Sequence, residues 1–292
     1  MSTDLSPLEE YNVGKLTKEI RAVAAGMGRQ EARLLVDSYY QLQEGRKAAS
    51  NQVSACDRDV DQAPIAVLEW LVRNQLGLER GIATMMQAYA AGDPVGRWSL
   101  SICGIGPIIA AGLLAHIEIE KAPTAGHIWR FAGLDPTVEW GKGEKRPWNA
   151  QLKVLCWKIG ESFVKVSNNE NDYYGHLYIE RKALELERNE AGQFADQAAS
   201  ALERKSFRKD TVAKAAYEQG KLPPGHLHAR AKRWAVKLFL SHWQAVAYAC
   251  AYGVAPPRPY VVTHLGHAHV LLPPNMPEVI YTILEPAYLK AA

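Results

Sequence analysis

Apolar residues recur at helical spacing along most of the chain, and the strict alternation that predicts β-strands is scarce. The pattern therefore predicts an all-α fold. We expect a long antiparallel coiled-coil hairpin arm in residues 1–94, a helical domain in residues 95–255, and a short Pro-rich extended tail in residues 256–292.

The arm is predicted from two heptad seams of similar length, in residues 29–56 and 64–89. If the second helix folds back antiparallel on the first, Arg46 comes close to Glu79, and an ion pair between them accounts for the one charged seam position. Because two helices leave apolar flanks such as Met86 uncovered, we expect a second copy of the arm to cover them, which predicts a homodimer. The seam residues that we expect to hold the arm together are Leu35, Tyr39, Leu42, Leu71, Leu78 and Ile82.

The formal charge of +3, from 34 basic and 31 acidic residues, conceals an uneven distribution. Between Lys142 and Lys165 there are six basic and two acidic residues, and between Glu203 and Lys237 there are ten and three. Aromatic residues lie among these charges, and cations with flat side chains suit phosphates and unstacked bases. The candidate nucleic-acid-binding residues are Lys142, Lys145, Arg146, Trp148, Asn149, Lys153, Arg204, Lys205, Arg208, Lys209, Arg230, Arg233 and Lys237.

An alternative interpretation treats these basic windows as solvated helix faces with tryptophans in the core. Trp157, which lies at helical spacing from Val154, is expected to be a core residue on either interpretation.

The segment 101–111 places Gly104 and Gly106 among apolar residues, between two apolar helices, which is the helix–hairpin–helix pattern. Glycines allow the backbone to approach a phosphate closely, and the following helix offers its free N–H groups. Such a loop holds a nucleic-acid backbone without reading its sequence. Both glycines are therefore candidate binding residues, and the alternative is an ordinary tight turn between buried helices.

Candidates for catalysis, metal binding or membrane insertion are weak. The four cysteines are far apart and form no CxxC pair, which is typical of thiols in a reducing cytoplasm. The N-terminus is polar and acidic, so we expect no export signal. We predict no cofactor, no metal and no membrane segment. Two patterns resemble metal sites only weakly. We interpret Asp57, Asp59 and Asp61 as residues of a polar turn. We interpret His264, His267 and His269 as histidines that form hydrogen bonds with the backbone.

Three motifs resemble, in order, the C-terminal domain of the bridge-RNA-guided insertion-sequence transposases. They are the turn GIGP at 104–107, the segment PTA…AGLDP at 123–136, and a glycine- and lysine-rich strip followed by NAQLK at 149–153. The resemblance covers about Ser101–Val166. A coiled-coil hairpin before such a domain is also similar to the Nop-domain proteins of box C/D guide-RNA particles. It resembles most closely the nuclease-free, TasA-type members of the TIGR-Tas effectors, whose Nop-like domain holds a guide RNA used to find DNA.

The sequence departs from those transposases in the parts that carry catalysis. They open with an acidic RuvC-like domain, for which we expect no room in this chain, and they place a catalytic serine in the strip, where this chain has none. Ser162 lies beyond the strip on a predicted helix. The resemblance therefore implies no catalytic residue in the strip.

The resemblance implies a non-catalytic, RNA-guided DNA-binding protein that holds a structured, box C/D-like guide RNA and finds DNA by base pairing. We expect it to be cytoplasmic, encoded by a bacterium or phage, and associated with the nucleoid. One alternative is a minimal insertion-sequence transposase or recombinase that uses Ser162 or an acidic residue supplied elsewhere. A second alternative is a structural helical protein that binds no nucleic acid.

Overall fold

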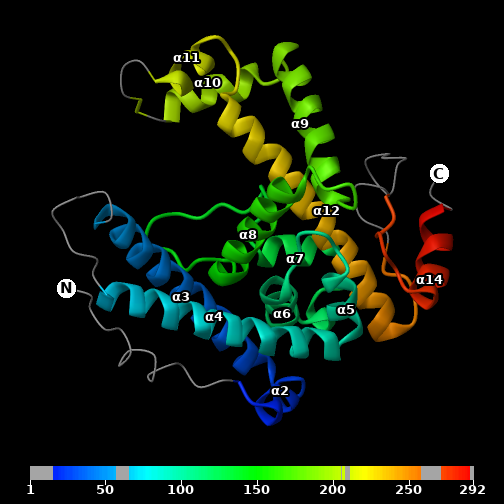
Figure 1. Ribbon diagram of the computed structural model, residues 1–292. Coiled ribbons are helices and arrows are strands. Elements are labelled where there is room, and N and C mark those ends of the chain that lie inside the picture. Colours follow the sequence, from blue (N-terminus) through cyan, green and yellow to red (C-terminus); the bar gives the residue numbers. More distant parts are fainter. Residues whose placement is uncertain (1–15, 57–65, 205, 208–210, 258–270, 290–292) are drawn as a thin grey trace. The chain divides into compact units, whose positions relative to one another are not determined.

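The structure is a computed structural model, and it describes residues 16–56, 66–204, 206–207, 211–257 and 271–289. Within these ranges every regular element is a helix and none is a strand (Figure 1). The predicted all-α fold is confirmed. The chain divides into two compact units. Unit 1 comprises residues 1–100 and 106–118, and unit 2 comprises residues 101–105 and 119–292.

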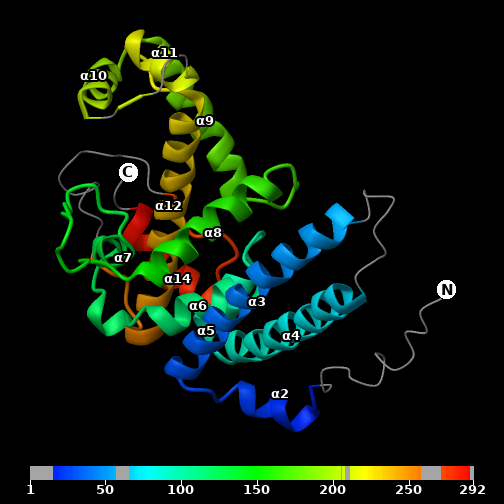
Figure 2. The same cartoon turned by 90° about the vertical axis from the view of Figure 1, so that its left-hand side faces the viewer.

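Unit 1 contains the predicted arm. Its helices are α2 (Lys18–Ala24), α3 (Arg29–Cys56), α4 (Ala66–Gly92), α5 (Pro94–Leu100) and α6 (Pro107–His116). The long helices α3 and α4 lie antiparallel and side by side along their length (Figures 1 and 2). Their bounds lie close to those of the two heptad seams, and the coiled-coil character of the hairpin stays a prediction.

The predicted ion pair sets the register of the arm. The guanidinium of Arg46 donates two hydrogen bonds to the carboxylate of Glu79, from Nε at 2.6 Å and from Nη2 at 3.0 Å. Glu79 is buried, at 4% exposure, whereas Leu78 is 40% exposed. Leu78 is thus half-exposed in a single copy of the chain, and its role in the seam stays a prediction.

Helix α6 covers the flank of the arm that the sequence had left open. Ile108 and Ala111 of α6 join Val36, Ile82 and Met86 in one buried cluster. Met86 is fully buried there. The apolar surface at Met86 is thus satisfied within the chain, and this position no longer requires a second copy. The homodimer stays a prediction.

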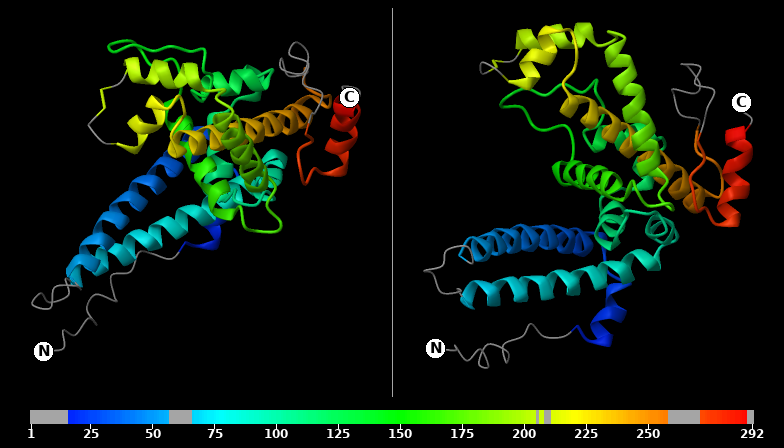
Figure 3. Two further views of the ribbon diagram at one scale, coloured as in Figure 1. Left: turned by 90° about the horizontal axis from the view of Figure 1, so that it is seen from above. Right: turned by 45° about the horizontal axis from the view of Figure 1, so that its top comes forward.

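Unit 2 is built around one long helix. Its elements are η1 (Ile119–Lys121), α7 (Ala125–Phe131), α8 (Ala150–Val166), α9 (Tyr174–Glu190), α10 (Ala195–Arg204), α11 (Val212–Glu218), α12 (Pro224–Tyr252) and α14 (Glu278–Leu289). Helix α12 packs against α7, α8, α9 and α14. Helices α9 and α12 lie side by side, and α10 and α11 lie at the end of this pair (Figure 3).

Aromatic residues fill the core where α8, α9 and α12 meet. The rings of Phe163 and Tyr174 stack at 5.0 Å, and Phe239 meets both edge-on. All three are fully buried. Beside them, the Tyr174 hydroxyl lies 2.7 Å from Nδ1 of His242, and Nε2 of His242 lies 2.8 Å from the carbonyl oxygen of Leu271. His242 therefore links the segment after α12 to the core.

The tail differs from the predicted extended segment. Residues 278–289 form α14, in which Ile280 and Leu284 are buried, and this helix packs against α12. The prolines led to the wrong prediction for this part. Pro277 precedes the helix, where its carbonyl accepts hydrogen bonds from Ile280 and Tyr281, and Pro286 is accommodated within the helix.

Candidate nucleic-acid interface

The loop between α7 and α8 is closed at its base by main-chain hydrogen bonds. Gly133, with φ of +66°, ends α7 in the left-handed conformation that favours glycine. The Leu134 N–H then donates to the Trp129 carbonyl at 2.8 Å, and the Asn149 N–H donates to the Phe131 carbonyl at 2.9 Å. The Asn149 side chain caps α8 by accepting from the Leu152 N–H. Asn149 thus acts as a structural cap for the loop and helix.

Two tryptophans support the interior of this loop. The Trp148 ring lies directly over Gly133, since a Cβ there would come within 2.7 Å of the indole. Trp140 meets Trp148 edge-on at 5.8 Å, and its indole N–H donates to the Glu144 carbonyl at 2.9 Å. The Glu144 carboxylate accepts from the Gly141 N–H. The loop therefore has a defined conformation set by aromatic packing.

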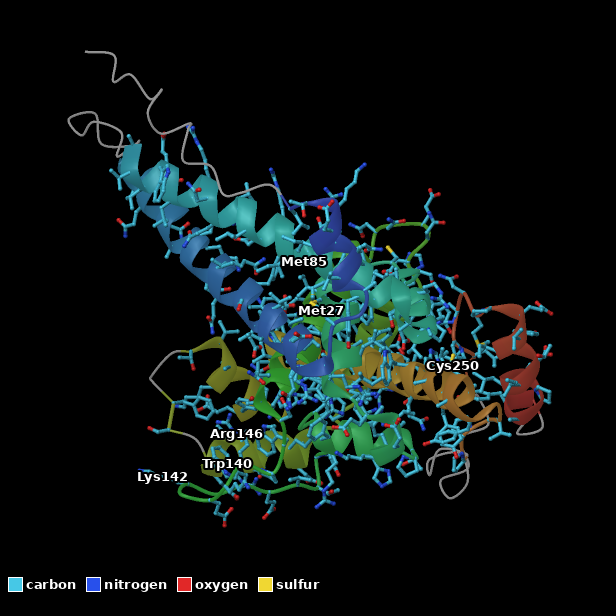
Figure 4. All side chains as sticks on the ribbon, turned by 90° about the horizontal axis from the view of Figure 1, so that it is seen from below. Met27, Met85, Trp140, Lys142, Arg146 and Cys250 are labelled. Atoms are coloured by element: carbon cyan, nitrogen blue, oxygen red, sulfur yellow. The ribbon has the colours of Figure 1, made fainter. Side chains whose placement is uncertain are left out.

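Basic side chains line these two rings. The Arg146 guanidinium lies 5.4 Å from the Trp140 ring centre, and Lys153 Nζ lies 4.1 Å from that of Trp148. Lys142 and Lys145 are exposed on the same loop. Figure 4 shows Trp140, Lys142 and Arg146 together on this loop. We call Trp140, Lys142, Lys145, Arg146, Trp148 and Lys153 the basic strip.

The cations of the basic strip make no close contact with carboxylates of the described residues. Within the described part of the chain, none of its four cations forms an ion pair. Four cations without a carboxylate partner among the described residues, two of them lying over indole rings, make a surface suited to phosphates and bases.

The predicted basic face of α12 is less uniform than its spacing indicates. Arg230 donates through Nε to Glu185 at 2.8 Å, and Arg181 binds the same carboxylate. Burial raises the pKa of Glu185, but the hydrogen bonds from Arg230 and Arg181 outweigh burial and hold it below its ordinary value. Arg230 therefore stabilises the α9–α12 pair.

The other two cations of α12 differ in their surroundings. Lys237 Nζ lies 4.1 Å from the Trp129 ring centre, and burial lowers its pKa. Arg233 is exposed. Arg204 is exposed at the end of α10. The remaining predicted residues of this window, Lys205, Arg208 and Lys209, lie outside the described residues.

The two hairpin glycines have different environments. Gly104, with φ of +87°, packs against α8, where a Cβ would lie 3.1–3.5 Å from Val166, Ser162 and Phe163. The Ser162 hydroxyl donates to the Gly104 carbonyl at 2.5 Å. Gly106 precedes α6, and nothing lies within 4 Å of a Cβ built there. The close contact with α8 explains why position 104 is a glycine, whereas the space beside Gly106 is open.

The described residues contain no group of three or more His, Cys, Asp or Glu side chains placed to hold a metal ion. Both weak metal patterns, at 57–61 and 264–269, lie outside these residues. Burial raises the pKa of the Cys156 thiol to about 12, so this thiol is not a nucleophile. Among the described helices, none combines the length and the apolar content needed to cross a membrane.

The structure adds Trp157, which the sequence interpretation had placed in the core. Its side chain is 54% exposed on α8. The buried face of α8 carries Leu152, Leu155 and Ile159. Trp157 does not share the spacing of these residues and lies off the buried face. The sequence feature that indicates its exposure is its position between Lys153 and Lys158, and not its hydrophobicity.

Comparison with known proteins relates part of this surface to a family. Residues 99–154 match the Transposase IS116/IS110/IS902 family. The match includes the hairpin, α6, α7 and the whole basic strip, and it ends before Trp157. No curated protein and no solved structure matches the chain. The chain thus has a transposase-like segment that includes the loop between α7 and α8.

Proposed function

We propose that the chain is a non-catalytic, RNA-guided DNA-binding protein. It holds a structured, box C/D-like guide RNA, and the unpaired bases of that RNA select DNA by base pairing. The protein itself contacts the nucleic-acid backbone and recognises the shape of the RNA. It acts in the cytoplasm of a bacterium, near the nucleoid. The basic strip is the main contact with the RNA.

One observation carries this proposal. Four cations that form no ion pair within the described residues share this loop and the start of α8, and two of them, Arg146 and Lys153, lie over indole rings, inside the segment that is similar to a transposase family. Neutralising such charges with phosphates releases counterions, which makes binding favourable and strongly dependent on salt. A structural helical protein has no need for cations grouped in this way.

The first test is the nucleic acid that the protein carries. We expect the full chain, purified from its own host cell, to contain a defined small RNA that can be sequenced. Loading this RNA makes the protein bind DNA that matches its unpaired segment and not a scrambled sequence. A preparation free of RNA, or binding that ignores the DNA sequence, would overturn the proposal.

The second test reverses the charge of the basic strip. Changing Lys145→Glu, Arg146→Glu and Lys153→Glu together is expected to weaken RNA binding by about 100-fold or more and to flatten its salt dependence. A matched control carries Lys47→Glu, Arg73→Glu and Arg80→Glu on the arm, with the same change in net charge. Fluorescence anisotropy across a salt series measures both. Equal losses in the two variants would remove the strip from the binding surface.

A minimal transposase or recombinase is a second candidate function, favoured by the family match at residues 99–154. Ser162 is its candidate nucleophile, and in this structure the Ser162 hydroxyl donates to the Gly104 carbonyl. A strand-transfer assay separates the two functions. Strand exchange by the wild-type chain that disappears in Ser162→Ala supports the recombinase, and absence of exchange with intact RNA binding supports the non-catalytic protein.

A further inference from the structure

An exposed tryptophan with cations around it lies on α8, beyond the segment matched by the transposase family. Trp157 is 54% exposed, and Val154, one turn before it, is 51% exposed. Leaving this much apolar surface in water is unfavourable, by about 25 cal/mol for each Å². The side chains around it show what kind of molecule would cover it.

Two lysines lie beside the Trp157 ring. Lys158 Nζ is 5.5 Å and Lys232 Nζ is 5.7 Å from the ring centre. Lys232 also forms an ion pair with Glu161, so its charge is partly balanced. Lys153, one turn before Trp157, forms no ion pair within the described residues. Three lysines and one carboxylate, Glu161, thus lie in this part of α8 and α12, and by formal charge these four residues sum to a positive value.

The position of Lys232 is set by close packing of two helices. At Gly160, a Cβ would come within 2.6 Å of Lys232 Cγ and 3.2 Å of Val236. The stem of Lys232 therefore crosses α8 against the glycine backbone. Its side chain is only 13% exposed, so the amine is held beside the indole and not left to move in solvent.

The Trp157 surface is continuous with the basic strip. Lys153 lies over the ring of Trp148 at 4.1 Å and stands four residues before Trp157 on the same helix, a rise of about 6 Å. A strand whose phosphates contact the strip can thus place its next groups over α8. A flat apolar surface with cations on its rim matches a nucleobase attached to phosphates.

We propose that Trp157 is a stacking platform for an unpaired base of the bound nucleic acid. Lys158 and Lys232 flank the stacked base, and Lys153 contacts the adjoining phosphate. The site takes single-stranded nucleotides and not duplex, because a paired base cannot present its face to the indole. This inference rests on the proposed function, since it names the part of the nucleic acid that the protein holds.

The test compares two probes with the full chain, a labelled uridine oligonucleotide and a long RNA duplex of two complementary strands without unpaired bases. Changing Trp157→Ala is expected to weaken oligonucleotide binding by about tenfold or more, with the salt dependence and the duplex affinity unchanged. Trp157→Phe retains a ring and most of the affinity. Tyr252→Ala, which removes another half-exposed aromatic side chain of unit 2, serves as the matched control.

Each outcome decides the inference. Wild-type affinity of Trp157→Ala for the oligonucleotide would overturn it, as would an equal loss for the duplex. A change of mass in light scattering, with unchanged oligonucleotide binding, would assign Trp157 to a protein contact instead. If the wild-type chain binds neither probe at any salt, the proposed function fails first, and that result is distinct from a failure at Trp157 alone.

Discussion

His242 makes unit 2 sensitive to acid because both of its ring nitrogens are occupied. The Leu271 carbonyl can only accept, so Nε2 carries the proton and Nδ1 accepts from the Tyr174 hydroxyl. Adding a second proton would break the bond to Tyr174 and place a charge in the core. Burial accordingly lowers the pKa of His242 from 6.5 to about 4.

The sign of the resulting pH dependence follows from this shift. Above pH 6.5 the ring is neutral in both states and stability is complete. Between pH 6.5 and about 4, His242 is protonated in the unfolded chain but not in the folded chain, so the free energy of unfolding falls as pH falls. We expect a loss of about 3 kcal/mol over this range, measured by urea unfolding at several pH values.

Replacing the ring separates His242 from other titrating groups. We expect His242→Gln to be less stable at pH 7 but to lose much of the slope between pH 6.5 and 4. His127→Gln, at an exposed histidine of the same unit, serves as control and retains the wild-type slope. A variant at His242 with the full slope would show that other residues carry the acid sensitivity.

Apart from the Arg46–Glu79 pair, contacts between residues close in sequence were easier to predict than contacts between distant helices. The capping role of Asn149 and the turn at Gly133 arise from local backbone rules. The exposure of Trp157 depends on which face of α8 meets α12, and the Gly104–Ser162 contact joins residues far apart in the chain. Hydrophobicity alone carries no information about such partners.

At the scale of the element, the predicted arm depends on how α3 and α4 pair. Two long helices with a seam must pair antiparallel when a short turn joins them, and a charged seam position needs an opposite charge across it. Arg46 and Glu79 satisfy both conditions. Glu79 is buried and Leu78 is half-exposed in this single copy, so the seam role of Leu78 stays a prediction.

The Arg46–Glu79 pair is expected to stabilise the arm mainly by avoiding an unpaired buried charge. Arg46→Met leaves Glu79 without its partner and destabilises the protein by about 3 kcal/mol. Adding Glu79→Leu removes the charge and restores most of this loss. Urea unfolding followed by circular dichroism measures both variants.

An exposed pair on the same arm provides the comparison. Lys47→Met with Glu44→Leu removes an ion pair whose side chains are 48% and 65% exposed, and we expect a change below about 1 kcal/mol. If the double variant at Arg46 and Glu79 remains as unstable as Arg46→Met alone, the buried charge is not the cause.

At the scale of the whole molecule, the sequence predicted an all-α fold but not how its helices cover one another. The expected homodimer relied on apolar flanks of the arm, and α6 buries one of these at Met86. Trp70 remains partly exposed on α4, so a second copy still has a surface to cover. We expect light scattering of the full chain to give the mass of a dimer, and the mass of one chain would refute it.

The basic strip and the tail illustrate what the sequence could and could not predict for this molecule. The strip was found because charge clusters are visible in sequence and because its motifs resemble a known family. Helix α14 was missed because its prolines are typical of extended chain, whereas its packing against α12 favours the helix. The basic strip is visible in the local sequence, whereas in α14 the packing of the helix overrides the local preference of its prolines.

The crossing at Gly160 links the evolution of two positions. Any residue larger than glycine at 160 would collide with the stem of Lys232, so an alanine there is tolerated only with a shorter side chain at 232. That second change would remove the amine beside Trp157. We expect natural variants of this chain to keep glycine and lysine together at positions 160 and 232, or to lose both along with the indole.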